Sequence, residues 1–298
     1  MKKKKLVSII INCYNGEKYL SKTLYSVLSQ TYSNYEVIFF DNCSTDRSSK
    51  IFKSFNDSRF RYFKTKKKIS LYKSRNLALK KCKGSFITFL DADDWWDKNF
   101  LKSRNKFFRS SNNYAFAFSN CYHYFEKNKK YKKFLNYDFP SGNILNDLLK
   151  FYFVKLSTII LKREIIQKYK FNPDYNIIGD YDLIIRISEK YKGMAFQDFL
   201  VNIRIHEKNF THNNRGMFYK EFKKWIEGQN FKKKDFKENK YYLMKKLDYL
   251  KLINLLLNSK SFNIIFGILR FPFGIEKLKL LLIYFLPKFL IDIKLKYF

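Results

Sequence analysis

Three carboxylates lie close together in the segment GSFITFLDADDWWD, which spans residues 84–97. Asp91, Asp93 and Asp94 come directly after a short apolar run of the kind that forms a strand buried on both faces. Carboxylates two residues apart repel each other unless a cation lies between them. Oxygen ligands at the end of a parallel strand suit Mg²⁺ or Mn²⁺ carrying a nucleotide phosphate. The alternative is an acidic turn that caps a helix beginning near Trp95, because Asp is a favourable N-cap residue.

Polar residues also follow two earlier apolar runs. Val7 to Ile11 leads into the polar loop 12–17, and Glu36 to Phe40 ends at Asp41. Ligands of parallel sheets bind in the crevice beyond the carboxyl ends of the strands. We therefore expect the loop, Asp41 and the three carboxylates to converge on one site, large enough for a nucleotide.

The elements that must position these residues alternate between strands and amphipathic helices. This alternation predicts an α/β fold with a mostly parallel sheet and helices on both faces. In the first predicted helix, four apolar residues recur at helical spacing and form one stripe that can pack on the sheet: Leu20, Leu24, Val27 and Leu28. Further predicted elements are a helix that includes Ile51 and Phe55, a short strand at 59–64, a helix at 71–81 and a strand at 85–90.

The charge of the chain limits its partners without choosing among them. The 298 residues carry a formal net charge of +34, which attracts nucleic acid, acidic lipid head groups and nucleotide phosphates alike. No zinc-finger or basic-zipper spacing and no aromatic platform of an RNA-recognition module occurs in the sequence, so nucleic-acid binding is not expected. The length predicts one or two domains.

Cysteine spacing and hydropathy bear on the compartment. The four cysteines are far apart and form no C-x-x-C pair, which favours a reducing compartment. The start, MKKKKLVSIIINCYN, has the basic head of a signal peptide, but its apolar run is short and no small-residue cleavage site follows. We therefore interpret it as the first strand. No window approaches the roughly 20 apolar residues of a transmembrane helix, so the chain is not expected to span a membrane.

Several blocks of the sequence resemble the family 2 glycosyltransferases with the GT-A fold, a Rossmann-like sheet with flanking helices. The blocks that carry the resemblance are VSIIINCYNGEKYLSKTLYSVLSQTYSNYEVIFFDNCSTD, SRNLALKKCKGSFITFLDADDWW, STIILKREII, NIIGDYDLIIRISEKY and NIRIHEKN. They cover most of residues 6–209 in the order found in the family, and the combination is far more specific than any single motif. The processive members carry a Q-x-x-R-W motif and transmembrane helices, and neither is found here, which favours a non-processive enzyme.

The resemblance implies donor-binding roles for residues in the first half of the chain. Asp41 would accept the ring N–H of uracil in a UDP-sugar, and its alternative role is a turn acid at a helix entry. Arg75 would lie near the diphosphate, and its alternative is a solvated helix charge. The other nucleotide-binding residues that the resemblance implies are Asn12, Tyr14, Asn15 and Glu17 in the loop after the first strand, and Asp91 near the ribose and metal.

The metal ligands follow from the same resemblance. Asp93 would contact the cofactor, Mn²⁺ or Mg²⁺, directly. His206, at the end of a predicted edge strand at 201–205, would approach the metal and the diphosphate, although a lone histidine is more often structural or exposed. Asp94 is expected to cap the helix that follows.

The catalytic base is implied at the start of a helix in the block GDYDLIIRISEKYKG. The family carries an acid pair there, whose second member is the base and matches Asp180. The first member is Gly179 in this chain, so the base lacks a supporting neighbour, and Asp182 is the weaker alternative. Acids at a helix N-terminus also have a structural explanation, because the helix dipole stabilises negative charge.

Two regions carry less information. Residues 99–161 are expected to hold a helix at 100–108, a strand at 115–119, a charged loop at 126–133 and a helix at 144–151. That loop is either a solvated excursion or part of an acceptor site, and the sequence leaves both open. The catalytic domain is expected over residues 1–214, with a nucleotide-sugar half at about 1–97 and an acceptor half at about 98–214.

The remaining residues, 215–298, predict a basic, aromatic-rich helical extension. Residues 228–298 contain 15 Lys and Arg against 5 Asp and Glu, interleaved with apolar side chains. This pattern favours reversible binding to an anionic membrane surface, the cytoplasmic face of the cell membrane. Packing on the catalytic domain and a homodimer interface are the alternatives.

The resulting hypothesis is a metal-assisted, inverting glycosyltransferase. It would move one sugar from a nucleotide-sugar donor, UDP-linked, to a hydroxyl of a growing, lipid-linked cell-surface glycan such as a polysaccharide or lipopolysaccharide. One alternative is a nucleotidyltransferase on a related fold, although the loop 12–18 has only one glycine. The other is a relative that binds anions or membrane without catalysis, since Asn42, Cys43 and Gly179 depart from the family pattern.

Overall fold

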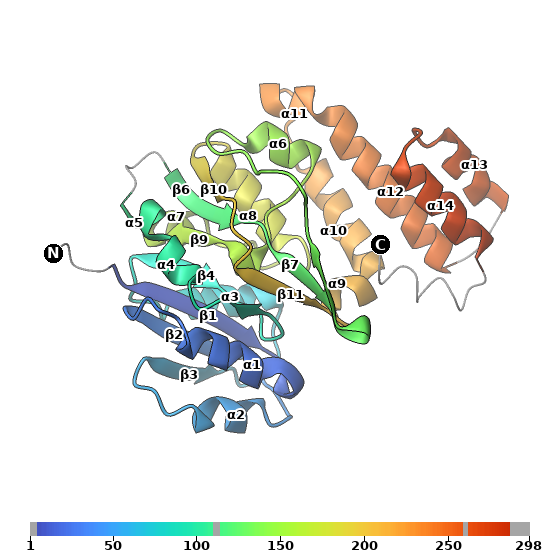
Figure 1. The fold of residues 1–298 in the computed structure, drawn as a ribbon. Helices are drawn as coiled ribbons and strands as arrows, with labels where there is room; N and C mark the ends of the chain where they lie inside the picture. Colours follow the sequence, from blue (N-terminus) through green and yellow to red (C-terminus); the bar gives the residue numbers. More distant parts are fainter. Residues whose placement is uncertain (1–4, 110–113, 259–261, 287–298) are drawn as a thin grey trace. The chain divides into compact units, whose positions relative to one another are not determined.

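The computed structural model describes residues 5–109, 114–258 and 262–286 (Figure 1). The chain forms two compact units. The first consists of residues 1–147 with 152–205, and the second of residues 148–151 with 206–298. The first unit contains two sheets with helices around them, as expected for an α/β protein of the GT-A type, and the second consists of helices.

The larger sheet has seven strands in the order β10-β6-β9-β4-β1-β2-β3. Their bounds are β1 Val7–Cys13, β2 Tyr35–Asp41, β3 Phe60–Lys64, β4 Phe86–Phe89, β6 Tyr114–Ser119, β9 Ile160–Lys162 and β10 Lys192–Phe196. All neighbouring pairs are parallel except those that β9 makes with β4 and β6. The carboxyl ends of β1, β2 and β4 therefore lie at one edge, with Cys13 directly opposite Asp41.

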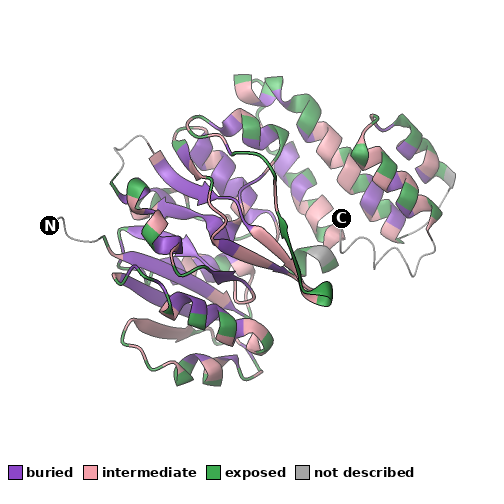
Figure 2. Cartoon of the chain, viewed as in Figure 1, coloured by how far each residue is buried: buried purple, intermediate pink, exposed green. Residues whose placement is uncertain are grey.

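Burial explains why the first strands could be predicted. Every residue of β2 and β4 is buried, and β1 is buried except at Asn12, so these segments read as continuous apolar runs (Figure 2). The helices of this unit are α1 Glu17–Leu28, α2 Ser48–Ser54, α3 Leu71–Leu79, α4 Phe100–Ser103, α5 Asn105–Phe108, α7 Arg163–Tyr169 and α8 Gly179–Ser188, and the chain passes from the first unit to the second within α6 Leu145–Lys150. Leu20, Leu24 and Val27 of α1 are fully buried, which confirms the predicted stripe.

A second sheet of four strands corrects three expectations, the first of which is the charged loop at 126–133, because residues 130–133 form a strand that pairs with residues 122–125. Its order is β5-β11-β7-β8, with bounds β5 Trp95–Trp96, β7 Tyr122–Phe125, β8 Lys130–Lys133 and β11 Val201–Ile205. The helix expected near Trp95 is wrong, because Trp95 and Trp96 pair with Asn202 and Val201 as a short strand. The expected edge position of 201–205 is also wrong, since β11 lies between β5 and β7.

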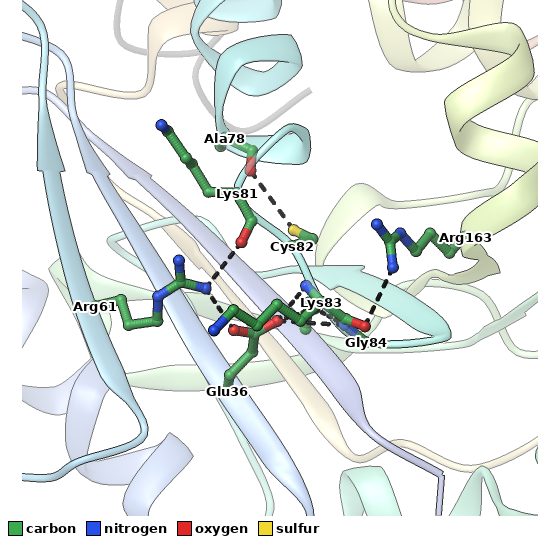
Figure 3. Close-up of polar contacts among 9 residues, drawn as sticks. Glu36, Arg61, Ala78, Lys81, Cys82, Lys83, Gly84 and Arg163 are labelled. Atoms are coloured by element: carbon green, nitrogen blue, oxygen red, sulfur yellow. Dashed lines mark hydrogen bonds and ion pairs between the residues drawn. The ribbon is translucent and has the colours of Figure 1, made fainter.

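At the amino ends of the central strands, one carboxylate is enclosed by donors. Glu36 Oε1 accepts hydrogen bonds from Ser8 Oγ at 2.7 Å and from the backbone N–H of Lys83 at 2.5 Å, and Oε2 accepts one from Arg61 at 2.8 Å (Figure 3). Burial raises the pKa of Glu36, but these donors outweigh it and hold the pKa below its usual range. A Cβ on Gly84 would lie 2.6 Å from the Ser8 nitrogen, so this junction requires glycine.

The second unit has a core of its own. Its helices are α9 Phe210–Asn213, α10 Arg215–Glu227, α11 Lys234–Glu238, α12 Lys240–Asn258, α13 Phe262–Arg270 and α14 Ile275–Phe285. The buried apolar residues of α12, the α13 region and α14 form one cluster: Leu252, Ile253, Leu256, Ile264, Ile268, Phe271, Leu280 and Ile283. Within the described ranges, no helix is long and apolar enough to cross a bilayer.

Candidate active site

The loops that follow β1 and β2 are joined to each other by hydrogen bonds. The backbone N–H of Asn15 donates to Ser44 Oγ at 3.0 Å, and that of Gly16 donates to Ser48 Oγ at 2.9 Å. In the opposite direction, Thr45 N–H donates to Asn15 Oδ1 at 2.9 Å. We call residues 14–17 and 42–48 the paired loops. Asn15 and Cys43 have left-handed backbone, with φ of 52° and 66°. Together these contacts fix the loop in which the sequence placed Tyr14, Asn15 and Glu17.

Asp41 lies beneath the paired loops and is fully buried. Its Oδ1 accepts the backbone N–H of Ser44 at 2.7 Å, and its Oδ2 accepts the Tyr62 hydroxyl at 2.6 Å. Desolvation and the neighbouring Asp41 raise the pKa of Tyr62 to about 12, so Tyr62 stays protonated and donates. The carboxylate is thereby held in one orientation at the end of β2.

The other predicted residues of this loop have different surroundings. Asn12 donates its amide to Ser74 Oγ at 2.8 Å, while its Oδ1 is buried and meets no donor among the residues that the structure describes. Tyr14 is 45% exposed, and the Lys68 ammonium lies 3.8 Å from the centre of its ring. Glu17 Oε2 accepts the backbone N–H of Arg47 at 2.9 Å. Tyr14 thus offers an exposed aromatic face, and Asn12 offers an unused acceptor.

Arg75 is buried against the end of β4. It is 4% exposed, so the alternative of a solvated helix charge is wrong. Its Nη2 donates to Asp91 Oδ1 at 2.7 Å, and the Asp91 side chain remains 44% exposed. Desolvation raises the pKa of Asp91, Arg75 opposes that rise, and the negative charges of Asp93 and Asp180 add to it. Arg75 therefore acts on the site through Asp91, which keeps an accessible face.

Asp94 has a structural role, although not the one expected. No helix begins beside it, because α4 begins at Phe100. Its Oδ2 accepts the Ser157 hydroxyl at 2.7 Å, and its Oδ1 accepts the backbone N–H of Arg204 at 3.0 Å. Desolvation, followed by the charges of Asp93 and Asp91, raises the pKa of Asp94 well above its usual range. Asp94 thus ties the end of β4 to β11 instead of capping a helix.

Arg204 continues this connection between the two sheets. Its Nε donates to the carbonyl oxygen of Asp93 at 3.0 Å. Its guanidinium lies 4.5 Å from the Tyr19 ring centre and 4.8 Å from that of Trp95, distances typical of cation–π contacts. The backbone of Asp93 is therefore held from the side of the second sheet.

The acids at the end of β4 fit a cation that arrives with a nucleotide. In the described part of the chain, no three His, Cys, Asp or Glu side chains group into a closed metal site. A nucleotide-borne Mg²⁺ needs fewer protein ligands, because one or two carboxylates suffice when phosphates and waters complete its shell. Asp91 and Asp93 lie close enough for one charge to raise the pKa of the other. These two carboxylates are the ones that would hold such an ion.

Asp180 lies in the first turn of α8, 89 positions from Asp91 in the sequence. The Tyr72 hydroxyl is 3.1 Å from Asp180 Oδ1, and the Arg75 guanidinium lies 5.1 Å from the centre of the Tyr72 ring. Burial lowers the pKa of Arg75, but the carboxylates of Asp91 and Asp180 help to raise it above its usual range. Arg75, which is paired with Asp91, and Asp180 are therefore linked through Tyr72.

The alternative base, Asp182, is turned to another partner. It is 6% exposed, and its Oδ2 accepts Arg186 Nη2 at 2.7 Å and Nε at 3.0 Å. Arg186 also donates to the carbonyl oxygens of Tyr169 and Lys170, so the pair joins α8 to the end of α7. This geometry gives Asp182 a structural role.

His206 belongs to the second unit. Its Nδ1 accepts the backbone N–H of Lys208 at 3.2 Å. The metal contact predicted for His206 remains a prediction.

Sequence reasoning missed several side chains that organise the site, chiefly Tyr62, Tyr72, Ser157 and Arg204. Only the register could have indicated Tyr62, which stands on β3 opposite Phe39 of β2. The glycine at position 179 was the one signal for Tyr72, and its significance depends on a contact more than 100 residues away.

Comparison with known proteins agrees with this geometry. The profile described as Glycosyl transferase family 2 matches residues 8–188. The glucosyltransferase WfaP of Escherichia coli, described as a UDP-Glc:alpha-D-GlcNAc-diphosphoundecaprenol beta-1,3-glucosyltransferase, is 34% identical over 62% of this chain and 71% of its own length. WfgD of Escherichia coli, which has the same description, is 34% identical over 56% of this chain.

The chain spans less than two thirds of some relatives, 64% of WfgD and 30% of a longer glycosyltransferase from Rickettsia bellii. Among solved structures, the mannosyltransferase PcManGT of Pyrobaculum calidifontis, in complex with GDP-Man and Mn²⁺, aligns with 99% of this chain and 86% of its own at a TM-score of 0.63 and 15% identity. That likeness establishes the fold, and the profile match over residues 8–188 establishes that the chain belongs to glycosyl transferase family 2.

Proposed function

We propose that the chain transfers one sugar from a UDP-sugar to a hydroxyl of a lipid-linked glycan, with inversion at the anomeric carbon. The observation that carries this proposal is the chain of contacts from Asp91 through the buried Arg75 and the ring of Tyr72 to Asp180. Relatives in the family that are described as acting on UDP-Glc and a diphosphoundecaprenol-linked sugar support the donor and the acceptor class.

The nucleotide would lie along the paired loops. Asp41 is oriented by Tyr62 and Ser44, and its remaining lone pairs suit the ring N–H of uracil, but because Asp41 is fully buried this contact requires that the loop above it shift. Asn12 Oδ1 is a buried acceptor that a ligand donor would satisfy, and such atoms call for an explanation. The exposed ring of Tyr14 supports a stacking contact with the base or the sugar. Asn15 and Glu17 would act by holding the loop.

A divalent cation would be held by Asp93 and Asp91, and it would offset the negative charge that develops on the departing diphosphate. Arg75 fixes the orientation of Asp91 through the 2.7 Å ion pair. Because Arg75 is buried, its help toward the diphosphate passes through Asp91, and a direct phosphate contact requires that the pair rearrange. The family resemblance alone supports an approach of His206 to the metal and the diphosphate.

Asp180 would take the proton of the acceptor hydroxyl as that oxygen attacks the anomeric carbon. A single displacement of this kind inverts the anomeric configuration, because the nucleophile enters opposite the leaving diphosphate. General-base assistance is worth about 10² to 10⁴ in rate. Asp182, bound to Arg186, leaves Asp180 as the acid of α8 that would take this role.

Replacement of Asp180 by Asn tests the proposal. Asp180→Asn keeps the shape of the side chain and an acceptor for Tyr72 but removes the base. We expect sugar transfer to fall at least about 100-fold with donor affinity unchanged, measured by UDP release and by donor titration. The control is Asp147→Asn, which removes the same charge from an exposed position in α6. Normal transfer by Asp180→Asn would refute the assignment of the base.

The reaction products distinguish a glycosyltransferase from the two alternatives, a nucleotidyltransferase and a protein that binds without catalysis. A glycosyltransferase releases UDP from a UDP-sugar in the presence of Mn²⁺ or Mg²⁺, whereas a nucleotidyltransferase releases pyrophosphate. A protein that only binds anions or membrane releases neither. A panel of UDP-sugars offered with a lipid-linked acceptor would therefore decide the class and name the donor sugar in one experiment.

We further propose that the second unit holds the enzyme on the inner face of the cell membrane. Large apolar side chains of α13, α14 and the turn between them are exposed: Phe266, Leu269, Phe273, Ile275, Leu278, Leu282 and Phe285. Phe273 is 84% exposed, and Arg270, Lys277 and Lys279 lie nearby in the sequence. A basic surface with exposed aromatic side chains suits anionic lipid.

Sedimentation with vesicles tests this location. We expect binding to vesicles that contain anionic lipid, weak binding to neutral vesicles, and release by salt because the charged contribution is screened. Replacing Phe273 and Phe285 together by Ser should weaken binding to anionic vesicles without altering transfer to a soluble acceptor analogue. A stable dimer in solution, lost in the same variant, would support the dimer alternative.

A further inference from the structure

Position 179 is occupied by the ring of another residue. The family resemblance leads us to expect an acid there, but a Cβ atom built on Gly179 would lie 2.5 Å from both Cδ2 and Cε2 of Tyr72. Cβ atoms do not approach ring carbons so closely, so any side chain at position 179 requires the Tyr72 ring to move. The position of the Tyr72 ring therefore requires glycine at position 179.

Tyr72 has little room to move. It is 2% exposed, and its ring stacks on that of Phe171, with centroids 5.2 Å apart and an interplanar angle of 28°. Phe171 is fixed in turn, because its backbone N–H donates to Asn76 Oδ1 at 3.0 Å and its carbonyl oxygen accepts the Asn76 amide at 2.8 Å. Helix α3 thus presents Tyr72 to the first turn of α8 in one orientation.

The Tyr72 hydroxyl reaches two oxygens of the segment that begins α8. It lies 2.9 Å from the carbonyl oxygen of Ile177 and 3.1 Å from Asp180 Oδ1. Burial and the neighbouring Asp180 raise the pKa of Tyr72 well above its usual range, so the hydroxyl keeps its proton and remains a donor. Asp180 is the acceptor whose charge changes during a reaction that uses it as a base.

We propose that Tyr72 is the positioning residue for Asp180, and that it stands in place of the acid that the family pattern puts at position 179. The inference rests on the proposed role of Asp180 as the base. The Tyr72 hydroxyl contacts Oδ1 of the Asp180 carboxylate and fixes its orientation, which leaves Oδ2 to accept the proton of the acceptor hydroxyl.

Tyr72→Phe tests this role, because it removes the hydroxyl and keeps the ring. We expect kcat to fall about tenfold while the KM for the donor is unchanged. A residue that is merely structural would lower the melting temperature without this selective fall in kcat.

The matched control is Tyr35→Phe. Tyr35 is as buried as Tyr72, and its hydroxyl donates to the Val27 carbonyl oxygen at 3.0 Å, outside the site. This variant should lose stability and keep both kcat and the KM for the donor. If Tyr72→Phe has the kinetics of Tyr35→Phe, while Asp180→Asn abolishes transfer, then the positioning role is wrong and the proposed base stands. If Asp180→Asn retains transfer, Asp180 is not the catalytic base, and the positioning role of Tyr72 is then wrong as well.

A double-variant cycle tests the pairing of the two positions. Gly179→Ala alone should lower transfer at least about tenfold, because the new Cβ displaces the Tyr72 ring. In a background of Tyr72→Ala, where the ring is absent, Gly179→Ala should cause no further loss of transfer or of melting temperature. Equal losses in both backgrounds would show that the two residues act independently and would overturn the pairing.

Discussion

The acidic side chains at the two ends of the central strands have different surroundings. At the amino ends, the single carboxylate of Glu36 receives Ser8, Lys83 and Arg61 as donors. At the carboxyl ends, Asp91, Asp93 and Asp94 crowd together, and Arg75 forms an ion pair with Asp91. Three donors surround one acid at the amino ends, whereas three acids lie within four residues at the carboxyl ends.

The difference appears in the direction of the pKa shifts. The pKa of Glu36 is held below its usual range, whereas those of Asp91 and Asp94 are raised, although desolvation acts on all three. A carboxylate with a lowered pKa contributes to the stability of the folded chain. Carboxylates that raise one another's pKa cost stability, and such sites are where function is found. Each of the following variants is chosen to separate these two kinds of acid.

The largest effect is expected for Asp93→Asn. Loss of a carboxylate that would hold the cation should lower metal-dependent transfer by about 10³-fold, which corresponds to several kcal/mol of transition-state stabilisation. The melting temperature should stay within a few degrees of that of the parent chain, because repulsion with Asp91 and Asp94 is relieved. UDP release at a series of Mn²⁺ concentrations and a thermal melt provide the two measurements. A large fall in melting temperature would break the comparison.

Glu36→Gln should have the opposite pattern. It removes the negative charge to which Arg61 and the Lys83 backbone N–H donate hydrogen bonds. The single amide oxygen of the new Gln side chain must then accept from several donors. The free energy of unfolding at pH 7 should fall by about 3 kcal/mol, measured by urea denaturation, because a buried carboxylate's charge-assisted hydrogen bonds are lost. Transfer per folded molecule should be retained. A variant of normal stability and lowered activity would mean that this end of the sheet also serves function.

The smallest effect is a difference in the sign of the pH dependence. Glu36 has a folded pKa below its ordinary value of 4.5, so its contribution to stability is present above that pH and is lost as the pH falls through the folded pKa. Asp94 has a folded pKa above its ordinary value of 3.8, so it costs stability progressively as the pH rises above 3.8.

Relative to the parent chain, the free energy of unfolding of Asp94→Asn should therefore rise by on the order of 1 kcal/mol between pH 4 and pH 8. That of Glu36→Gln should fall relative to the parent chain at pH values above the folded pKa of Glu36. Urea denaturation at several pH values measures both slopes. Slopes of the same sign for the two variants would contradict the opposing pKa shifts.

Prediction from sequence succeeded where burial is continuous. The runs that form β1, β2 and β4 are buried along almost their whole length, so hydrophobic periodicity alone indicated them. It failed at Trp95 and Trp96, which become a strand only because Val201 and Asn202 lie beside them. No local preference encodes a pairing between segments about 100 residues apart.

Some residues of the candidate site could likewise be predicted from the sequence, and others could not. Asp41, Asp91 and Asp180 could be named because they stand at strand ends or a helix start and match the blocks of the family. Tyr72 could not, since its significance depends on the space above Gly179, which only the folded chain reveals. Arg75 could be named, but its ion pair with Asp91 could not, because helical spacing says nothing about a contact with the end of β4.

The hydrogen bonds between the paired loops bear on how quickly a donor can be accepted. Asn15, Gly16 and Glu17 each use a backbone amide to hold the neighbouring loop through Ser44, Ser48 and Asp46. The entropy of ordering this part of the pocket is thus lost when the chain folds and not when substrate arrives. A preorganised rim of this kind favours encounter with the nucleotide at a rate set by diffusion and charge, and the shift of the loop above Asp41 would follow that encounter.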